Sequence, residues 1–412
     1  MSLPPVDQLF VCYIPTLDLR RIDKDTTPYI SKLLEDYSWS EMTNLPESHL
    51  VQTLVTGTPP HVHGFSQVKL KESEAPFKLT AADKIPDWLS TTYQCFVHLF
   101  TGSFDLAAVP HRRRRLMELK RTKYMTTEQA IDLIAPHAPT IFNIVGKGRS
   151  RWIYCRKYHK LKNFIPGLFA PDNRLELFEI YALDVTSHWN LDHPKIMKNL
   201  YRKIDSLVQD LHQKAKQNNF AFLLLSDHGQ EPVKGTIDIK KKLNHSKIPK
   251  NEYLFFVHAV QARFWFFTDR ARKEITAMLS AIPNGQVLSY KDLHNYNMKF
   301  PDNRYGDTFF LTEPGYIMFP NDFYHPLANL FLGLDRQQYR RIWSPHQKGY
   351  HGYLPSNDCE KGFMLITNDH FKLKKNMNIL DFAPSVLELL GYRKSDKMQG
   401  QSVIEEKVSV DK

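Results

Sequence analysis

Two short sequences place an Asp and a His, both able to bind divalent cations, directly after an apolar run. Asp227 and His228 follow the run 222–226, while Asp184 and His188, four residues apart, follow the run 175–183. Mixed carboxylate and imidazole ligands suit zinc, iron and manganese. Taken alone, Asp227 and His228 are equally compatible with an Asp that caps the following turn beside an incidental His. The remaining sequence has to decide between these two interpretations.

A third candidate ligand is His351, which lies in the sequence GYHGYLP of an expected loop. His61 and His63, in the sequence PPHVHGF, alternate along another expected loop. We interpret this second pair as surface residues and not as metal ligands.

The elements that would position these residues have the pattern of an α/β protein. Apolar runs predict buried strands at 9–14 and 222–226, and the apolar spacing predicts helices at 28–37, 50–56 and 194–217. A strand, a helix and a second strand in succession form the unit of a parallel sheet, and ligands gather at the carboxyl ends of such strands. We therefore expect a central, mostly parallel sheet with helices on both faces.

The same patterns divide the chain into parts. We expect a metal-binding core formed by residues 1–244 and 346–405, an inserted α+β cap at 245–345 and a flexible tail at 406–412. The run 140–145 (TIFNIV) predicts a strand, and the basic run 111–115 (HRRRR) is typical of a solvated helix face or loop.

Composition bounds the class of protein and its partners. The chain has 412 residues, of which 42% are hydrophobic and 24% charged, and a net charge of +11. These values are typical of a globular protein and compatible with a small anionic substrate. Four scattered cysteines, no apparent signal peptide and no membrane-length apolar run predict a cytoplasmic protein without a membrane partner. No nucleic-acid-binding signature accompanies the basic run, which disfavours that partner.

Several motifs in one order resemble a known family. The sequences at 27–34 (TPYISKLL), 54–65 (LVTGTPPHVHGF) and 379–391 (ILDFAPSVLELLG) accompany the three groups of candidate ligands. Their order resembles that of the alkaline phosphatase superfamily, and within it of the nucleotide pyrophosphatase/phosphodiesterase-type enzymes. Several spaced motifs are more specific than any single match.

The resemblance implies two divalent metal ions above the central sheet. Two such ions stabilise the attacking and the leaving oxygen of a phosphoryl transfer. It assigns Asp184, His188 and His351 to one ion. It assigns Asp227 and His228 to the other, together with a first-strand Asp and a Thr or Ser nucleophile. With this context, metal binding becomes the favoured interpretation of all five residues.

Two positions depart from the family pattern. The first-strand Asp falls on Pro15, and the nucleophile, ten residues before Gly57, falls on Glu47. In one account Glu47 binds the second metal ion and water activated by the cations is the nucleophile. In a second account the nucleophile is Ser48, and Asp18 approaches the metal in place of Pro15; Asp18 as an ordinary turn residue is favoured over this role.

We therefore predict a metal-dependent hydrolase of a phosphate ester, phosphodiester or pyrophosphate-like bond, with zinc as the expected metal. A dinuclear iron or manganese enzyme with oxygen-dependent chemistry is one alternative, since the same ligands suit those metals. A catalytically inactive binding protein on the same fold is another.

Overall fold

The computed structural model describes residues 4–46, 50–64, 68–71, 84–101, 108–119 and 127–407. Contacts divide the chain into one unit of residues 1–64, 126–230 and 355–412 and a second unit of residues 65–125 and 231–354. The insertion predicted at 245–345 thus covers only part of the second unit, which also includes residues 65–125, 231–244 and 346–354. Of the tail predicted at 406–412, Glu406 ends a strand and residues 408–412 lie outside the described residues.

The first unit is built on a seven-stranded sheet whose central strands are apolar and buried. Strand β16 is antiparallel to both neighbours, and the other strands share one direction, which confirms the mostly parallel sheet. In order across the sheet the strands are β18 (Asn376–Asn378), β2 (Ser38–Thr43), β16 (Gly362–Ile366), β7 (Ala221–Ser226), β1 (Leu9–Tyr13), β6 (Leu175–Ile180) and β5 (Ser150–Cys155).

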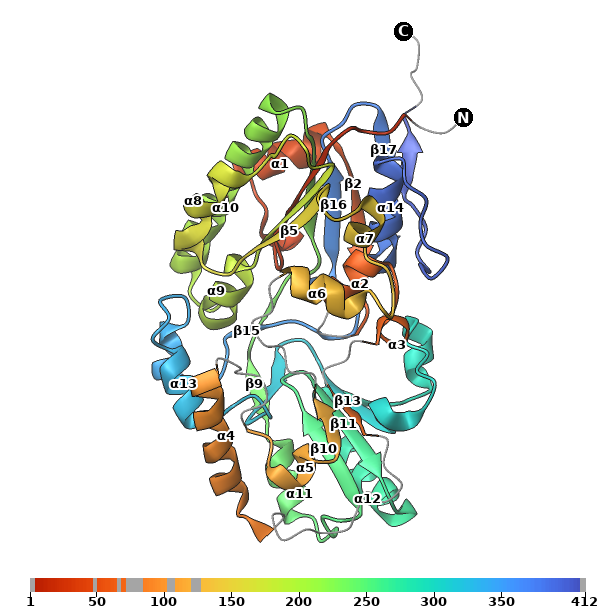
Figure 1. The fold of residues 1–412 in the computed structure, drawn as a ribbon. Helices are drawn as coiled ribbons and strands as arrows, with labels where there is room; N and C mark the ends of the chain where they lie inside the picture. The colour runs from red at the N-terminus through yellow and green to blue at the C-terminus, as the bar shows by residue number, and fades with distance from the viewer. Residues whose placement is uncertain are drawn as a thin grey trace. The chain divides into compact units, whose positions relative to one another are not determined.

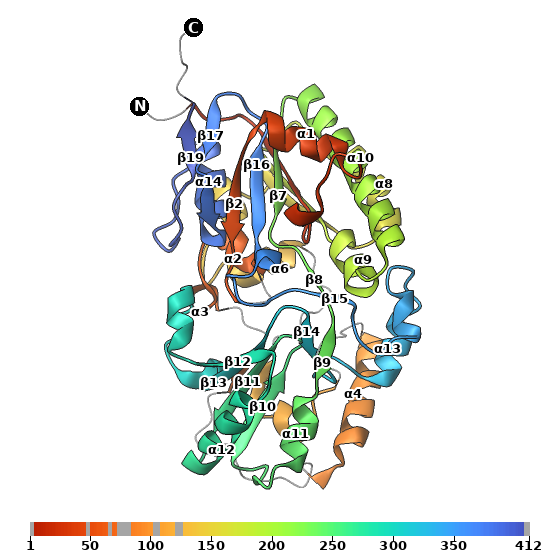
Figure 2. The same ribbon diagram turned by 180° about the vertical axis from the view of Figure 1, so that it is seen from behind.

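Helices cover both faces of this sheet (Figures 1 and 2). One face packs against α1 (Pro28–Asp36), α8 (Leu161–Phe164), α9 (Ala182–Asn190) and α10 (Pro194–Gln217). The other carries α2 (Leu50–Thr56), α7 (Ile141–Val145) and α14 (Phe382–Leu389), while α6 (Thr127–Ile134) contacts β5.

Side-chain alternation along the strands decides what reaches each face. Cys12 of β1 and Phe178 of β6 belong to the core beneath α10. Because successive side chains of a strand point to opposite faces, Tyr13 and Glu179 point to the other face. These two residues are partners in the β1–β6 register, at the carboxyl ends of their strands.

The second unit has its own antiparallel sheet and apolar core. Its strands lie in the order β10 (Tyr253–Val257), β11 (Gln261–Phe266), β13 (Thr308–Thr312) and β12 (Gly285–Ser289). The core contains apolar residues of α11 (Ile239–His245) and α12 (Asp269–Ser280). Its other helices are α4 (Asp87–Thr101), α5 (His111–Arg114) and α13 (Pro326–Leu332), and β3 (Val68–Leu70) pairs with β4 (Met117–Leu119).

Short elements complete both units. The remaining helix is α3 (Pro60–His63), and the remaining strand pairs are β8 (Glu231–Pro232) with β15 (Gly349–Tyr350), β9 (Gly235–Ile237) with β14 (Tyr316–Met318), and β17 (Phe371–Leu373) with β19 (Ile404–Glu406). Among the described residues, no helix combines the length and the apolar character needed to cross a membrane.

Three local predictions were wrong. Residues 141–145 form helix α7, because Thr140 and Asn143 close a capping box that starts a helix. The histidines at 61 and 63 lie on α3, and His63 is buried with its Nε2 3.0 Å from Oγ1 of Thr53.

The third wrong prediction concerns Arg113 of the basic run 111–115, whose other residues are half-buried. Arg113 is buried and donates hydrogen bonds to both carboxylate oxygens of Asp322, at 2.9 and 2.8 Å. Lys240 lies 2.8 Å from the same carboxylate. The charge of Arg113 therefore stabilises the interior of the second unit instead of facing solvent.

Candidate metal centre

The loop that follows β7 carries Asp227 and His228 at the carboxyl edge of the sheet, and both residues are 3% exposed. The next residue, Gly229, donates its backbone N–H to the carbonyl of Cys359 at 2.8 Å. A Cβ atom at Gly229 would lie 2.4 Å from Cγ of Asp18. Only glycine therefore allows the loop to pack this closely on Asp18.

The carboxylate of Asp227 is held by two donors. Its Oδ2 accepts a hydrogen bond from the hydroxyl of Tyr13 at 2.6 Å, and its Oδ1 accepts one from the backbone N–H of His228 at 3.0 Å. Burial, together with the charge of Asp227, raises the pKa of Tyr13 well above its usual value. Tyr13 therefore stays neutral and remains a hydrogen-bond donor at ordinary pH.

The ring of His228 is oriented by its own loop. Its Nδ1 lies 2.9 Å from the carbonyl oxygen of Gly229, so this nitrogen is assigned the proton. The lone pair of Nε2 is then available to a cation. Burial lowers the pKa of His228, but the negative charges of Asp227 and two further carboxylates outweigh burial, and the pKa is raised overall.

Asp184 and His188, which were expected just after a strand, lie on helix α9. Four residues apart on a helix, they share one face, and Oδ1 of Asp184 lies 3.5 Å from Nε2 of His188. The side-chain amide of Gln230 also donates to Oδ1 of Asp184, at 3.1 Å. Asp184 is thus fixed between α9 and the loop after β7.

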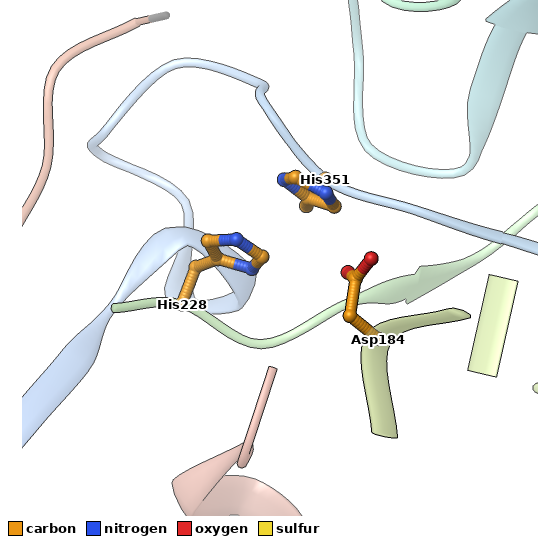
Figure 3. A group of neighbouring side chains, drawn as sticks. All are labelled: Asp184, His228 and His351. Carbon is orange, nitrogen blue, oxygen red and sulfur yellow. The ribbon is translucent and has the colours of Figure 1, made fainter. Parts of the chain in front are cut away.

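Three of the predicted ligands come together (Figure 3). Among the described residues, one ligand atom each from Asp184, His228 and His351 lies within 4.8 Å of the other two. Sequence reasoning had assigned His228 to a different cation from the other two residues. His188 and Asp227 are not members of this group; Oδ2 of Asp227 lies 3.4 Å from Nε2 of His228. Glu47 and Ser48 lie outside the described residues.

Asp18 is buried beside the same loop, but it pairs with a cationic side chain. Its Oδ1 accepts from Nε of Arg20 at 3.0 Å and its Oδ2 from Nη2 at 2.7 Å. Its Oδ2 is also 3.4 Å from the backbone nitrogen of Gln230. Asp18 is absent from the group that could hold a metal ion. The guanidinium thus neutralises the carboxylate that one account had placed on the metal.

Two buried carboxylates near the site, Glu179 and Glu360, were not among the residues predicted from the sequence. Burial, aided by the charges of Asp227 and Asp184, raises the pKa of Glu179 from 4.5 to about 8, against the hydrogen bond from Trp152. Glu360 is 1% exposed and contributes negative charge near His228. A charged residue within an otherwise apolar strand was the available signal for Glu179.

That signal is ambiguous, because β6 contains two glutamates. Glu176, near the opposite end of β6, accepts hydrogen bonds from Arg151, from Asn173 and from two backbone N–H groups. These donors satisfy the hydrogen-bonding capacity of the Glu176 carboxylate, which lies at the end of β6 away from the carboxyl edge of the sheet. Only the position of each glutamate along the folded strand separates a structural role from a place beside the site.

Comparison with known proteins agrees with the fold and identifies the family. The sequence model of the family "Type I phosphodiesterase / nucleotide pyrophosphatase" matches residues 17–316. A comparison with curated proteins gave no match.

Solved structures share the fold. Human ectonucleotide pyrophosphatase/phosphodiesterase 5 is 15% identical, with a TM-score of 0.58, and the match covers 96% of this chain and 97% of that one. Its murine counterpart, also 15% identical, has a TM-score of 0.59 with 94% and 96% covered, and an inactive murine variant was solved in complex with AMP. Because the family match spans most of the chain, the protein belongs to the type I phosphodiesterase/nucleotide pyrophosphatase family.

Proposed function

We propose that the protein is a metal-dependent hydrolase of a phosphate ester, phosphodiester or pyrophosphate-like bond. The observation that carries the proposal is the convergence of Asp184, His228 and His351 within 4.8 Å. Membership of the type I phosphodiesterase family makes hydrolysis of such bonds the chemistry that these residues would serve.

The donor set fits a divalent cation. One carboxylate and two imidazoles match the three protein ligands of catalytic zinc sites, which keep a further position open. The hydrogen bond between His228 and Gly229 leaves Nε2 as the ligand atom, and the amide of Gln230 orients Asp184. Zinc is the first candidate, with iron or manganese as alternatives for the same donors. When bound, such a cation polarises a phosphoryl oxygen and lowers the pKa of coordinated water.

The number of cations depends on His228. Its Nδ1 is engaged by Gly229, so the ring offers only Nε2, and that nitrogen serves a single cation. If His228 joins Asp184 and His351, the second cation predicted from the sequence must depend on Asp227 with Glu47. A stoichiometry of two cations would support a second ion on Asp227 and Glu47, and a stoichiometry of one would support the triad alone.

The substrate we propose is a small phosphorylated anion. The AMP complex of the murine structure makes nucleoside monophosphates and their esters the first compounds to test. The net charge of +11 favours encounter with an anion of this kind.

A second candidate function is binding of such an anion without turnover. Pro15 offers no ligand atom, and the charge of Asp18 is neutralised by Arg20, so the second metal position has fewer oxygen donors than the family pattern implies. A protein with these substitutions could retain a cation and a phosphorylated ligand while lacking a nucleophile.

Hydrolysis of a chromogenic phosphodiester separates these functions. The wild-type protein, purified without chelator, should release the chromophore, lose this activity in EDTA and regain it with zinc. His228→Ala should abolish the activity, whereas His159→Ala, at an exposed position, should retain it.

Other outcomes identify the alternatives. Binding of AMP, measured by calorimetry, without any turnover supports the binding protein. Oxygen consumption by an iron- or manganese-loaded protein that cleaves no ester supports the oxidative enzyme. Hydrolysis that survives exhaustive chelation contradicts the proposed mechanism.

A further inference from the structure

Helix α4 of the second unit has its polar and apolar faces reversed relative to an ordinary surface helix. Ser90, Gln94 and Cys95 are buried on one side. On the opposite side Tyr93 is 65% exposed and Phe100 is 88% exposed. A surface helix normally buries its apolar stripe, because removing apolar area from water stabilises the fold.

Specific contacts hold α4 in this orientation. The hydroxyl of Ser90 accepts the backbone N–H of His111 at 2.9 Å, and the side-chain oxygen of Gln94 accepts a hydrogen bond from Arg114. Cys95 packs on Ala328 of α13. The apolar face of α4 therefore points away from the second unit, because the polar face of α4 is hydrogen-bonded to that unit.

A second exposed apolar segment lies beside α4. Helix α13 contacts α4, and both views show the two helices side by side (Figures 1 and 2). Leu330 and Leu334 are 51% and 74% exposed, and Trp343, after the neighbouring 3-10 turn Tyr339–Ile342, is 82% exposed. In the described part of the second unit, all the exposed large apolar side chains belong to residues 85–100 and 330–343. We call these two segments the α4–α13 surface.

Basic residues accompany these apolar residues. Arg336, Arg340 and Arg341 are interleaved with the exposed apolar residues of 330–343, where Asp335 is the acidic residue. Arg112, which pairs with Asp87, borders the start of α4. Apolar residues with Trp and Tyr beside arginines are the combination that binds the interface of an anionic membrane.

We propose that the α4–α13 surface binds anionic phospholipid membranes peripherally, with the exposed aromatic and leucine side chains entering the interface and the arginines contacting lipid phosphates. A second copy of the chain fits this surface less well, because a two-fold interface would bring like-charged arginines together. Peripheral binding needs no membrane-spanning helix. It departs from the expectation of no membrane partner, and it is independent of the proposed hydrolase activity.

Vesicle co-sedimentation of the full chain tests this proposal. We expect the protein to sediment with vesicles of equal parts phosphatidylcholine and phosphatidylglycerol, and to remain in solution with phosphatidylcholine alone. Binding should weaken as salt rises, since the lipid charge is screened.

Two variants and a control locate the surface. Replacing Phe100 and Trp343 together by Ser should weaken binding by roughly tenfold or more. The variant lacks the free energy that the two aromatic side chains gain when they leave water for the membrane interface. Arg336→Glu with Arg340→Glu should remove the preference for anionic lipid. Trp39→Ser, at an exposed aromatic residue of the first unit, should bind like the wild type. Far-UV circular dichroism establishes that each variant is folded.

Three results would overturn the proposal. The first is a wild-type protein that stays in solution with anionic vesicles at low salt, and the second is folded variants that bind as well as the wild type. The third is a concentration-dependent dimer, seen by light scattering, that Phe100→Ser with Trp343→Ser dissociates, which would assign the surface to self-association.

Discussion

Asp18 and Asp184 follow neighbouring strands of the sheet by a few residues, and both are almost completely buried. Their partners differ in charge. Asp18 is paired with the guanidinium of Arg20, whereas Asp184 is oriented by the neutral amide of Gln230 and lies beside His188. Burial at the carboxyl edge of a sheet therefore does not by itself make a metal ligand. The charge of the neighbouring groups decides whether a buried carboxylate can serve a cation.

The largest effect expected from this comparison concerns cation binding. Zinc should stabilise the wild-type protein against unfolding, by about 2.7 kcal/mol at a hundredfold excess over Kd. Asp184→Asn should lose this gain, because a neutral amide is a poorer ligand than a carboxylate. Asp18→Asn is the matched control and should retain it. Thermal unfolding with and without zinc measures the difference, and an equal loss in both variants would remove the distinction between the two aspartates.

The second-largest effect is expected on stability when the positive charge of Arg20, which pairs with Asp18, is removed. Arg20→Gln leaves the buried Asp18 carboxylate without its cation and should lower the free energy of unfolding by about 2 kcal/mol, less than for a fully buried pair because Arg20 is partly exposed. Combining it with Asp18→Asn should restore most of the loss. Urea denaturation of the single and double variants measures this coupling; additive losses would show that the pair does not interact.

A smaller effect is expected at Tyr13. Tyr13→Phe removes the donor to Oδ2 of Asp227 and should lower the free energy of unfolding by about 1–2 kcal/mol. Tyr154→Phe, at an exposed position, serves as the control and should leave stability unchanged. Chemical denaturation distinguishes the two variants. A Tyr13→Phe protein as stable as the control would mean that Asp227 does not depend on this hydroxyl.

A pH dependence of stability is expected at Glu179. Its pKa is raised from 4.5 to about 8, so the folded state retains a proton that the unfolded state loses within this range. The stability linked to this proton is present below pH 4.5 and is lost as the pH rises to about 8. In chelator, Glu179→Gln should flatten this fall in the free energy of unfolding. An unchanged slope would place the titration elsewhere.

Much of the fold could be predicted from local patterns. The apolar runs of β1 and β7 and the periodicity of α10 depend on burial alone, and these elements appear where expected. Residues 141–145 were misassigned because their branched apolar side chains resemble a strand, whereas the cap formed by Thr140 and Asn143 starts a helix. A short apolar run is thus decided by its flanking residues.

Parts of the site could not be predicted, because they depend on pairing across the fold. Residue types and spacing suggested Asp184, His228 and His351, but not that these three would form one group. The partnership of Tyr13 with Asp227 joins residues 214 positions apart. Helix α4 was not predicted from the sequence, and which of its faces is buried depends on contacts with distant residues such as His111 and Ala328.

The metal content of the wild-type protein tests the central claim most directly. We predict that protein purified without chelator, or loaded with zinc and desalted, carries at least one tightly bound divalent cation per chain by mass spectrometry of the metals. His228→Ala should lose this cation, and Asp18→Asn should keep it. A folded wild-type protein that retains no divalent metal, or a His228→Ala variant with the full wild-type content, would contradict the assignment of Asp184, His228 and His351 as the metal centre.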